Sequence, residues 1–467
     1  MHWPLRLLLT ILFPSLGADG PIDTLVVTNP ADVRFESVPM SPFARWIAVQ
    51  KRGILTTTNE DGDDVASAVE RAIRERKLTS IDHVILVGSL RAIPMEKRKN
   101  PLPGKDAWIE TEPLAPRDGA PFSFAVGRIF HRDPKVVMRM LLSASAWHGP
   151  PARPPKALVV GNPGDSLPLV ETFARASAAE LKNAGYDVTP LIGHDSGRAE
   201  VRRRLPEQTV FLFEGHMSTL VRDYEAHRWT EPLRPSLILL QSCLVLTEER
   251  AGPFLERGAL AVAGSSTRTF SGSGGAVTLS YLDALLHDGQ TLGQGMRQAK
   301  NFLLAFAKLK EQRLTEKSQL GGANLRTAWA FTLWGDPTLK LPLASSNDRL
   351  PAVTHAVKGS SILIHIPVGK YPRLKSERYE VELTPNARLG GLLQKKDDDR
   401  QELIPLVFRE VHLPDVLNDV RPTLKSKLPR KSWVFLWDPR RRTGYLLVRP
   451  NPGQRELRFD VAASGTP

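Results

Sequence analysis

The sequence predicts an α/β protein built on a doubly wound parallel sheet and followed by a small all-β domain. Up to about residue 343, short apolar runs without polar alternation recur between amphipathic stretches of helical length. This pattern is typical of strands that helices cover on both faces. From about Pro351 onward, strand-like runs are separated only by turn residues, with no clear helix. That pattern is typical of a small antiparallel sandwich.

The first α/β unit is placed at residues 19–148, where strands and helices alternate. Strand–helix–strand at this spacing predicts a parallel sheet with right-handed crossovers. The Pro- and Gly-rich stretch Glu96–Pro121 is expected to be a long surface loop. The expected strands are Leu25–Val27, a short run from Ile54, Asp82–Gly88 and Phe124–Ile129, and the expected helices are Phe43–Lys51, Asp63–Lys77 and Pro134–Trp147.

A stiff linker, Gly149–Pro155, ends this unit, and the alternation restarts in a second α/β unit at residues 156–343. The glycine-rich run Ser271–Gly275 lacks the lysine of a phosphate-binding loop, so it is expected to be a flexible loop. The expected strands are Ala157–Val160, Asp187–Leu191, Thr209–Phe213, Ser236–Leu240 and Leu260–Gly264, and the expected helices are Leu169–Ala184, Ala276–Leu286 and Leu292–Leu314.

The all-β region at residues 351–467 is expected to be a separate module, so a fragment ending near Leu343 should fold alone. It holds 21 Lys and Arg against 13 Asp and Glu, and the whole chain has a net charge of +13. Basic runs at Lys425–Lys431 and Arg440–Arg442 are typical of a solvated face, with contact to an anionic surface as the alternative. The acidic run Asp397–Asp399 is interpreted as a solvated turn rather than a cation site.

Composition limits the function classes. Apolar residues make up 41% and charged residues 24% of the 467, which excludes a mainly disordered chain. The single cysteine excludes an intrachain disulfide and a Cys-based zinc or iron–sulfur site. We therefore expect no metal and no cofactor, and no nucleic-acid partner.

The N-terminus is interpreted as a signal peptide at residues 1–18. Arg6 precedes a short apolar run, and small residues follow near positions 17–19. The alternative is an uncleaved anchor, but the run is too short to span a bilayer and Pro14 interrupts it. The mature protein is then exported, to the periplasm, the cell surface or the medium, with no membrane-spanning segment. A lone thiol in an exported protein either pairs between chains or is free and reactive.

Two chemically versatile residues follow two buried strands of the second unit. His216 comes after the strand ending at Phe213, and Cys243 comes after the strand ending at Leu240. Because ligands bind beyond the carboxyl ends of parallel strands, neighbouring strands would place both side chains at one edge. A thiol needs a base to become a nucleophile, and backbone N–H groups stabilise the resulting oxyanion. The alternatives are an inert core thiol and a loop histidine satisfied by backbone.

The motifs resemble those of the gingipain-type cysteine peptidases of the caspase-like clan. Glu214-Gly215-His216 is similar to the family's Gly-His-Gly, and Gln241-Ser242-Cys243 is similar to its small-residue-Cys. Further similar segments are Val84–Gly88, Val126–Ile129 and Trp334–Leu339. The resemblance covers about residues 24–343 and implies a two-lobed caspase-like domain, often followed by an immunoglobulin-like domain.

The resemblance also implies roles for residues. His216 is the general base or acid, Cys243 the nucleophile, and the backbone N–H of Met217 an oxyanion donor in place of the family's glycine. Asp165 stands in the loop where gingipains carry an acid that assists the histidine. Leu167–Leu169 occupies the position where Arg-selecting members have an acid, so Arg specificity is not expected.

The sequence therefore predicts an exported cysteine endopeptidase that acts on polypeptides through a Cys–His dyad. Two alternatives stay open. One is a catalytically inactive relative that binds peptides or proteins. The other is a protein that binds polyanions or surfaces through its basic C-terminal domain.

Overall fold

The computed structural model describes residues 22–102, 106–117, 119–147, 154–162, 164, 167–311 and 319–343. From residue 354 onward it describes 354–358, 361–365, 373–375, 380–382, 392–394, 401–403, 407–413, 422–449 and 456–463. The signal peptide, most of the linker and Asp397–Asp399 lie outside these ranges. No helix in the described part of the chain is both long and apolar enough to cross a membrane.

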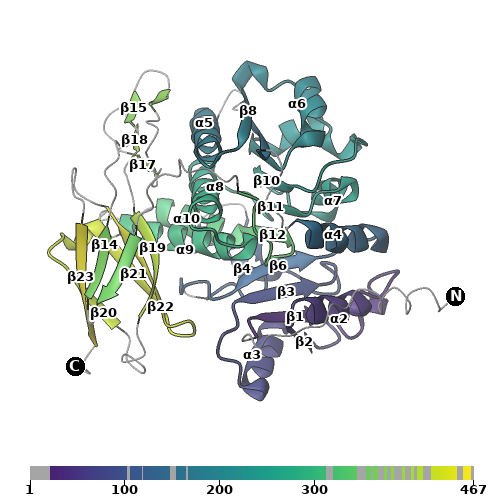
Figure 1. Cartoon of the computed structure of the whole chain (residues 1–467), viewed down its shortest axis with the longest axis horizontal. Helices are drawn as coiled ribbons and strands as arrows, with labels where there is room; N and C mark the ends of the chain where they lie inside the picture. Colours follow the sequence, from purple (N-terminus) through teal and green to yellow (C-terminus); the bar gives the residue numbers. More distant parts are fainter. Residues whose placement is uncertain are drawn as a thin grey trace.

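The core of the molecule is one ten-stranded sheet that both α/β units build together (Figure 1). β12 joins the two halves, because it runs parallel to β6 on one side and antiparallel to β11 on the other. The strand order is β2-β1-β3-β6-β12-β11-β10-β9-β7-β8. The bounds are β1 (Thr24–Thr28), β2 (Ile54–Thr57), β3 (His83–Val87), β6 (Ala125–Ile129), β7 (Lys156–Asn162), β8 (Asp187–Ile192), β9 (Val210–Gly215), β10 (Leu237–Gln241), β11 (Ala261–Ser265) and β12 (Phe331–Gly335).

Helices cover both faces of this sheet, as the apolar strands require. In the second unit, α5, α8, α9 and α10 bury apolar side chains on one face and α4, α6 and α7 on the other. In the first unit, α3 packs on one face and α2 and α4 on the other. The bounds are α2 (Ser41–Gln50), α3 (Val65–Arg76), α4 (Pro134–Ala146), α5 (Pro168–Asn183), α6 (Arg198–Arg204), α7 (Glu248–Arg257), α8 (Ser271–Leu286), α9 (Leu292–Glu311) and α10 (Gln319–Ala330).

Two sequence expectations in this part were wrong. The stretch expected to be a surface loop contains a hairpin of β4 (Glu96–Lys99) and β5 (Trp108–Thr111). Buried and exposed positions alternate in both strands, but the sequence does not show this as an alternation of apolar and polar residues. The glycine-rich run Ser271–Gly275 is the first turn of α8 rather than a flexible loop. Its glycines serve close packing, because a Cβ on Gly275 would stand 2.2 Å from the ring of Phe173 in α5.

The C-terminal region forms two small antiparallel sheets, which confirms the predicted all-β region. The sheets are β13-β14-β23-β20 and β19-β22-β21, and side chains from both pack in one apolar cluster. Two further pairs, β15–β16 and β17–β18, accompany them. The bounds are β13 (Thr354–Lys358), β14 (Ser361–His365), β15 (Arg373–Lys375), β16 (Glu380–Glu382), β17 (Leu392–Gln394), β18 (Gln401–Leu403), β19 (Val407–His412), β20 (Pro422–Lys425), β21 (Trp433–Asp438), β22 (Thr443–Val448) and β23 (Glu456–Ala463).

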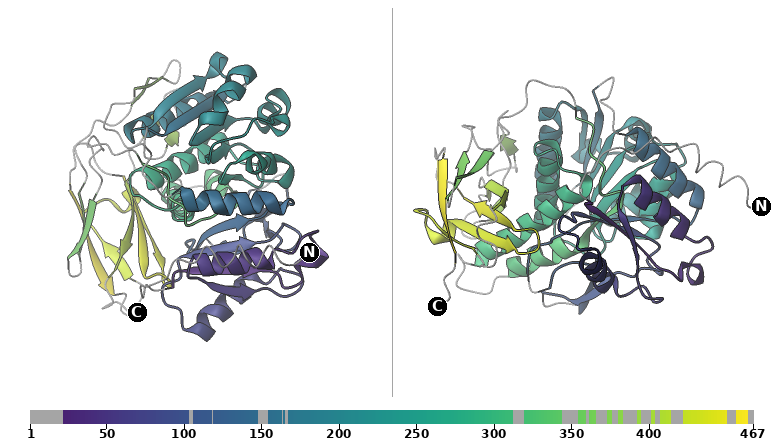
Figure 2. Two further views of the ribbon diagram at one scale, coloured as in Figure 1. Left: turned by 45° about the vertical axis from the view of Figure 1, so that its right-hand side comes forward. Right: turned by 60° about the horizontal axis from the view of Figure 1, so that its bottom comes forward.

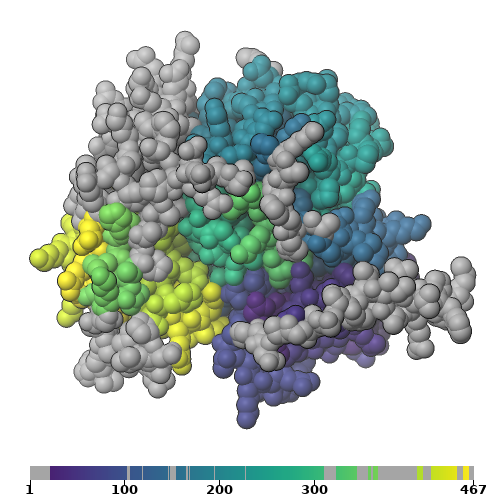
Figure 3. Space-filling model, in the orientation of Figure 1, coloured from purple at the N-terminus to yellow at the C-terminus, as the bar shows by residue number. Residues whose placement is uncertain are grey.

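The β19-β22-β21 sheet packs against α9, and the views in Figure 2 agree on this arrangement. Phe408 and Tyr445 belong to the same apolar cluster as α9, and the ring centroids of Phe302 and Phe408 lie 5.7 Å apart, edge to face. In the space-filling view, the yellow atoms of the all-β region lie against the green and blue atoms of the α/β region (Figure 3). The α/β and all-β regions thus share a core instead of meeting only at a linker.

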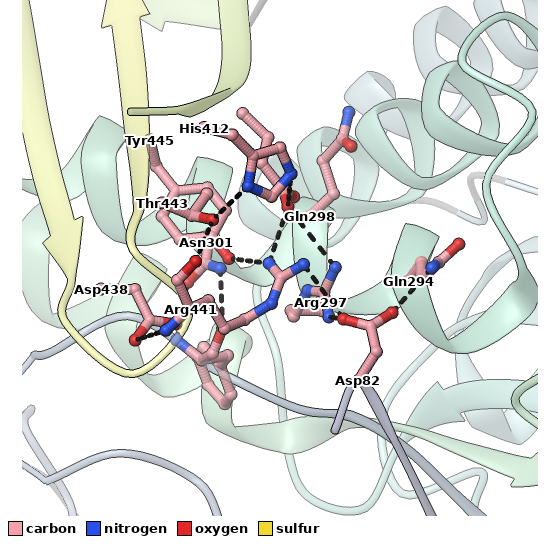
Figure 4. Close-up of polar contacts among 12 residues, drawn as sticks. Asp82, Gln294, Arg297, Gln298, Asn301, His412, Asp438, Arg441, Thr443 and Tyr445 are labelled. Carbon is pink, nitrogen blue, oxygen red and sulfur yellow. Dashed lines mark hydrogen bonds and ion pairs between the residues drawn. The ribbon is translucent and has the colours of Figure 1, made fainter. Parts of the chain in front are cut away.

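A group of four charges, of which Arg297 is buried and the other three are partly buried, fixes this junction (Figure 4). Arg441, from the turn between β21 and β22, lies 2.7 Å from Glu410 and 3.0 Å from Asp82. Arg297 of α9 forms a close ion pair with Asp82 and lies 3.6 Å from Glu410. These cations hold the pKa values of Asp82 and Glu410 below their ordinary range. We call these four residues the junction cluster.

Candidate active site

The carboxyl ends of β7, β9, β10 and β11 lie at one edge of the sheet because these neighbouring strands run parallel. In the β9–β10 ladder, Gln241 stands opposite Glu214. His216 directly follows β9, and Cys243 stands two residues after the end of β10. Both residues singled out from the sequence therefore lie beyond the carboxyl ends of adjacent parallel strands, at the edge of the sheet where α/β proteins bind ligands.

His216 is half-buried in the turn between β9 and a short helical segment. Its carbonyl accepts the amide of Thr219 at 3.1 Å, and the segment continues as a π-helical turn at Thr219–Asp223. The loop after β7 borders the imidazole, because a Cβ on Gly164 would lie 3.6 Å from His216 Cδ2. Gly164 has φ +53°, a conformation that favours glycine, so this border lacks a side chain.

Cys243 is half-buried, and its thiol is bound by the loop between β11 and α8. The amide of Thr269 donates to Cys243 Sγ at 3.4 Å, and the thiol donates to the carbonyl oxygen of Thr269 at 3.5 Å. An amide donor of this kind stabilises a thiolate more than a thiol. The partly exposed sulfur therefore lies in an environment compatible with nucleophilic chemistry.

A strained residue follows the cysteine directly. Leu244 has φ +53°, a left-handed backbone conformation that is strained for any residue other than glycine. The amide of Leu244 donates to the carbonyl of Thr267 at 3.1 Å, and the carbonyl of Leu244 accepts from the guanidinium of Arg250. These contacts hold a sharp turn that leaves Cys243 at the tip of β10.

The two assisting residues inferred from the sequence have different outcomes. Met217 is half-buried, and its side chain packs with the apolar cluster on the α4, α6 and α7 face of the sheet. Only its backbone is therefore a candidate for the oxyanion site. Asp165 lies outside the described residues, so its assisting role stays a prediction.

A buried carboxyl lies in β9, two residues before His216. Glu214 is fully buried, and one of its oxygens accepts the hydroxyl of Ser177 in α5 at 3.2 Å. The other oxygen has no hydrogen-bond partner among the residues that the structure describes. Burial without a neighbouring cation raises the pKa of Glu214 from 4.5 to about 8, so it is mainly protonated at neutral pH.

Sequence reasoning missed the contribution of Thr269 and Phe270. They follow β11, the third parallel strand, and the rule that pointed to His216 and Cys243 applies equally there. The glycine-rich run after Phe270 hid the start of α8, and with it the rigid support of this loop. Among the described residues, no group of three or more His, Cys, Asp or Glu side chains is arranged to hold a metal ion.

Comparisons with solved structures find proteins of similar fold. The Arg-specific cysteine proteinase gingipain R superposes with a TM-score of 0.51 at 14% identity, over 76% of this chain and 86% of that one. The complex of the pro- and mature domains of Porphyromonas gingivalis RgpB gives a TM-score of 0.50 at 13% identity, over 82% and 93%. A structure described only as a protease gives 0.52 at 15%, over 74% and 85%.

The chain has the caspase-like fold of the gingipains. The gingipain-type fold confirms the predicted architecture, a caspase-like α/β domain followed by a small all-β region. At these identities the likeness concerns the fold alone. No family model and no curated protein matches the sequence.

Proposed function

We propose that the protein is an exported cysteine endopeptidase that hydrolyses peptide bonds in polypeptides through Cys243 and His216. The single observation that supports this most is that β9 and β10 are parallel neighbours in the sheet, since His216 and Cys243 follow the carboxyl ends of these two strands. The gingipain-type fold adds support, since gingipain R, which shares this fold, is a cysteine proteinase. Export rests on the signal-like first 18 residues.

The proposed reaction follows from the two side chains. His216 takes the thiol proton, and the thiolate of Cys243 attacks the carbonyl carbon of the scissile bond. The backbone N–H groups of Met217 and Cys243 are the donors proposed for the oxyanion that forms. His216 then gives its proton to the leaving amine, and the thioester remains. Attack by water, with His216 as base, releases the acid and restores the thiol.

A second reading, a peptide-binding protein without catalysis, is favoured by one specific observation. In the described structure the thiol of Cys243 donates to the carbonyl of Thr269, a contact that an inert thiol would also make. Binding to polyanions through the basic Arg440–Arg442 run has less support. Arg441 belongs to the junction cluster, and Arg440 pairs with Glu70 and stacks over the ring of Phe124.

One experiment separates the first two readings. The purified full chain is incubated with iodoacetamide, and with a mixed peptide library whose products are identified by mass spectrometry. The peptidase proposal expects library cleavage that stops once Cys243 is alkylated. Alkylation without any cleavage would favour the binding protein, and resistance to alkylation in the folded state would mark a structural thiol.

A further inference from the structure

An exposed aromatic ring stands next to the residue that binds the thiol. Phe270 directly follows Thr269 and is the N-cap residue of α8, with φ −111° and ψ 139°. Its side chain is 44% exposed, one of the few large apolar side chains in the described ranges with that much accessible surface. Thr269 contacts Cys243 Sγ through its backbone, so Phe270 is one residue removed from the group that binds the thiol.

A second apolar side chain continues this surface. Leu169, in the first turn of α5, is half-buried and packs with Phe173, Ala176 and Leu279 between α5 and α8. Its Cδ1 would lie 3.8 Å from a Cβ on Gly272, two residues after Phe270. Gly272 in the first turn of α8 and Gly164 in the loop before α5 carry no side chains, and they border Leu169 and His216 respectively.

The three carboxylates described near this region make their contacts away from Phe270. Glu171, also in the first turn of α5, reaches toward Gly193 after β8, where its Oε1 would lie 3.2 Å from a Cβ. Asp223 lies 3.3 Å from Arg222. Asp106 lies 2.9 Å from Arg326, in the hairpin on the other side of the 266–269 loop. A desolvated cation needs a carboxylate partner, and these three carboxylates are already engaged away from Phe270.

We infer that Phe270 and Leu169 form an apolar wall beside Cys243 that selects an uncharged, apolar side chain next to the scissile bond. This inference rests on the proposed peptidase function, which it deepens by naming the substrate class. The rigid backbone at the start of α8 holds the wall, because the amide of Gly274 donates to the carbonyl of Phe270 at 2.7 Å. Burying a large apolar side chain against such a wall contributes roughly 1–3 kcal/mol, or about 10- to 200-fold in selectivity.

The test compares kcat/KM for peptides that differ only in the residue before the scissile bond: Leu, Phe, Asn or Arg. The wild-type protein is expected to favour Leu and Phe over Arg by about 10-fold or more. Phe270→Ala should lower kcat/KM for Leu and Phe by about 10-fold and change the Asn and Arg values by less than about 2-fold. Phe270→Leu should restore most of the preference, and Leu169→Ala should show a smaller loss of the same kind.

Leu142→Ala is the matched control, since Leu142 is 45% exposed on α4. It should leave all four values unchanged. An equal loss for all four peptides in Phe270→Ala would assign that residue to loop structure and overturn the inference. A wild-type preference for Arg that Asp165→Asn weakens would overturn it as well.

A binding measurement separates failure of this inference from failure of the proposed function. Fluorescence anisotropy records binding of the same peptides, labelled, to the full-length Cys243→Ala protein and to Cys243→Ala/Phe270→Ala. If the wild-type protein cleaves no peptide while Phe270→Ala weakens apolar peptide binding about 10-fold, the peptidase proposal fails and the wall stands. If peptide affinity depends neither on the residue before the scissile bond nor on Phe270, the inferred apolar wall does not exist.

Discussion

Thr269 contacts the thiol of Cys243 through both of its backbone polar groups, with N–H to Sγ at 3.4 Å and Sγ to the carbonyl oxygen at 3.5 Å. The carbonyl accepts from the protonated sulfur, whereas the amide donates to the ionised one, so the loop accommodates both states of a nucleophile. Because Thr269 directly precedes Phe270, the N-cap residue of α8, this contact ties the sulfur to a long helix packed between α5 and α9.

The first prediction concerns Cys243. Cys243→Ala removes the only nucleophilic thiol and should lower kcat for peptide cleavage by about 10³-fold or more. Because the side chain is half-buried at a strand end, the melting temperature should change by less than about 3 °C. Peptide cleavage and thermal unfolding of the same preparation measure both. Cleavage at the wild-type rate by the purified variant would contradict the nucleophile assignment.

The second prediction concerns His216. His216→Ala should lower kcat by about 10²- to 10⁴-fold, because the variant lacks the group that moves the proton between thiol and leaving amine. The melting temperature should stay nearly constant, since the half-buried ring lies beside a glycine loop rather than in a core cluster. Rates measured with and without added imidazole test the assignment. A large fall in melting temperature with retained activity would make His216 structural.

These two residues show how far sequence reasoning reached. The unbroken apolar runs ending at Phe213 and Leu240 predicted buried parallel strands, and parallel strands send their carboxyl ends to one edge. That argument needs only local pattern and topology. What it could not supply was the strand order, since β9 and β10 become neighbours through the arrangement of the whole sheet.

The contacts that the sequence did not predict depend on segments far apart in the chain. Thr269 meets Cys243 across 26 residues, and Arg441 meets Asp82 across the whole α/β region. The start of α8 was missed for a local reason. Gly272, Gly274 and Gly275 lower the helix propensity of this segment. Gly274 packs on Gln241 and Gly275 packs on Phe173, so closely that neither position has room for a Cβ.

The third prediction follows from the buried carboxyl in β9. Burial raises the pKa of Glu214 to about 8 in the folded state, whereas the unfolded chain has the ordinary value near 4.5. Below pH 4.5 both states are protonated and burial carries no ionisation penalty. Between pH 4.5 and 8 the unfolded state releases a proton that the folded state keeps, so stability falls as pH rises, and above pH 8 the loss is complete.

Glu214→Gln removes this titration while keeping the shape of the protonated carboxyl. The melting temperature of the variant should equal that of the wild-type protein near pH 4. At pH 8 it should be higher than the wild-type value by about 5 °C or more. Thermal unfolding across pH 4–9 measures the difference, and Glu75→Gln, an exposed position on α3, is the control. A difference that does not vary with pH would show that Glu214 does not titrate between these values.

The last prediction concerns the junction between the α/β and all-β regions. The sequence suggested that a fragment ending near Leu343 folds alone, but the structure argues against that independence. Removing residues 351–467 would expose the apolar face of α9 that contacts Phe408 and Tyr445. It would also leave Arg297 of α9, 2% exposed in the whole chain, without Glu410 and Arg441. We expect the fragment to aggregate or to melt far below the full chain.

Arg441→Met tests the same junction with a single side chain. The change leaves Glu410 and Asp82, both at least four-fifths buried, with Arg297 as their remaining cation in the junction cluster. Breaking a buried ion pair from one side costs about 3–5 kcal/mol, so the free energy of unfolding should fall by about that amount. Arg458→Met removes an exposed ion pair with Asp460 and should leave the free energy of unfolding nearly unchanged, because solvent screens such a pair.

Denaturant unfolding of the two variants and the wild-type protein gives the comparison. A single cooperative transition that moves as a whole in Arg441→Met would show that the all-β region unfolds together with the α/β domain. Equal stabilities for Arg441→Met and Arg458→Met, with two separate transitions in the wild-type protein, would instead show that the regions fold independently. In that case the junction cluster would only orient the all-β region, and a soluble fragment ending near Leu343 would follow.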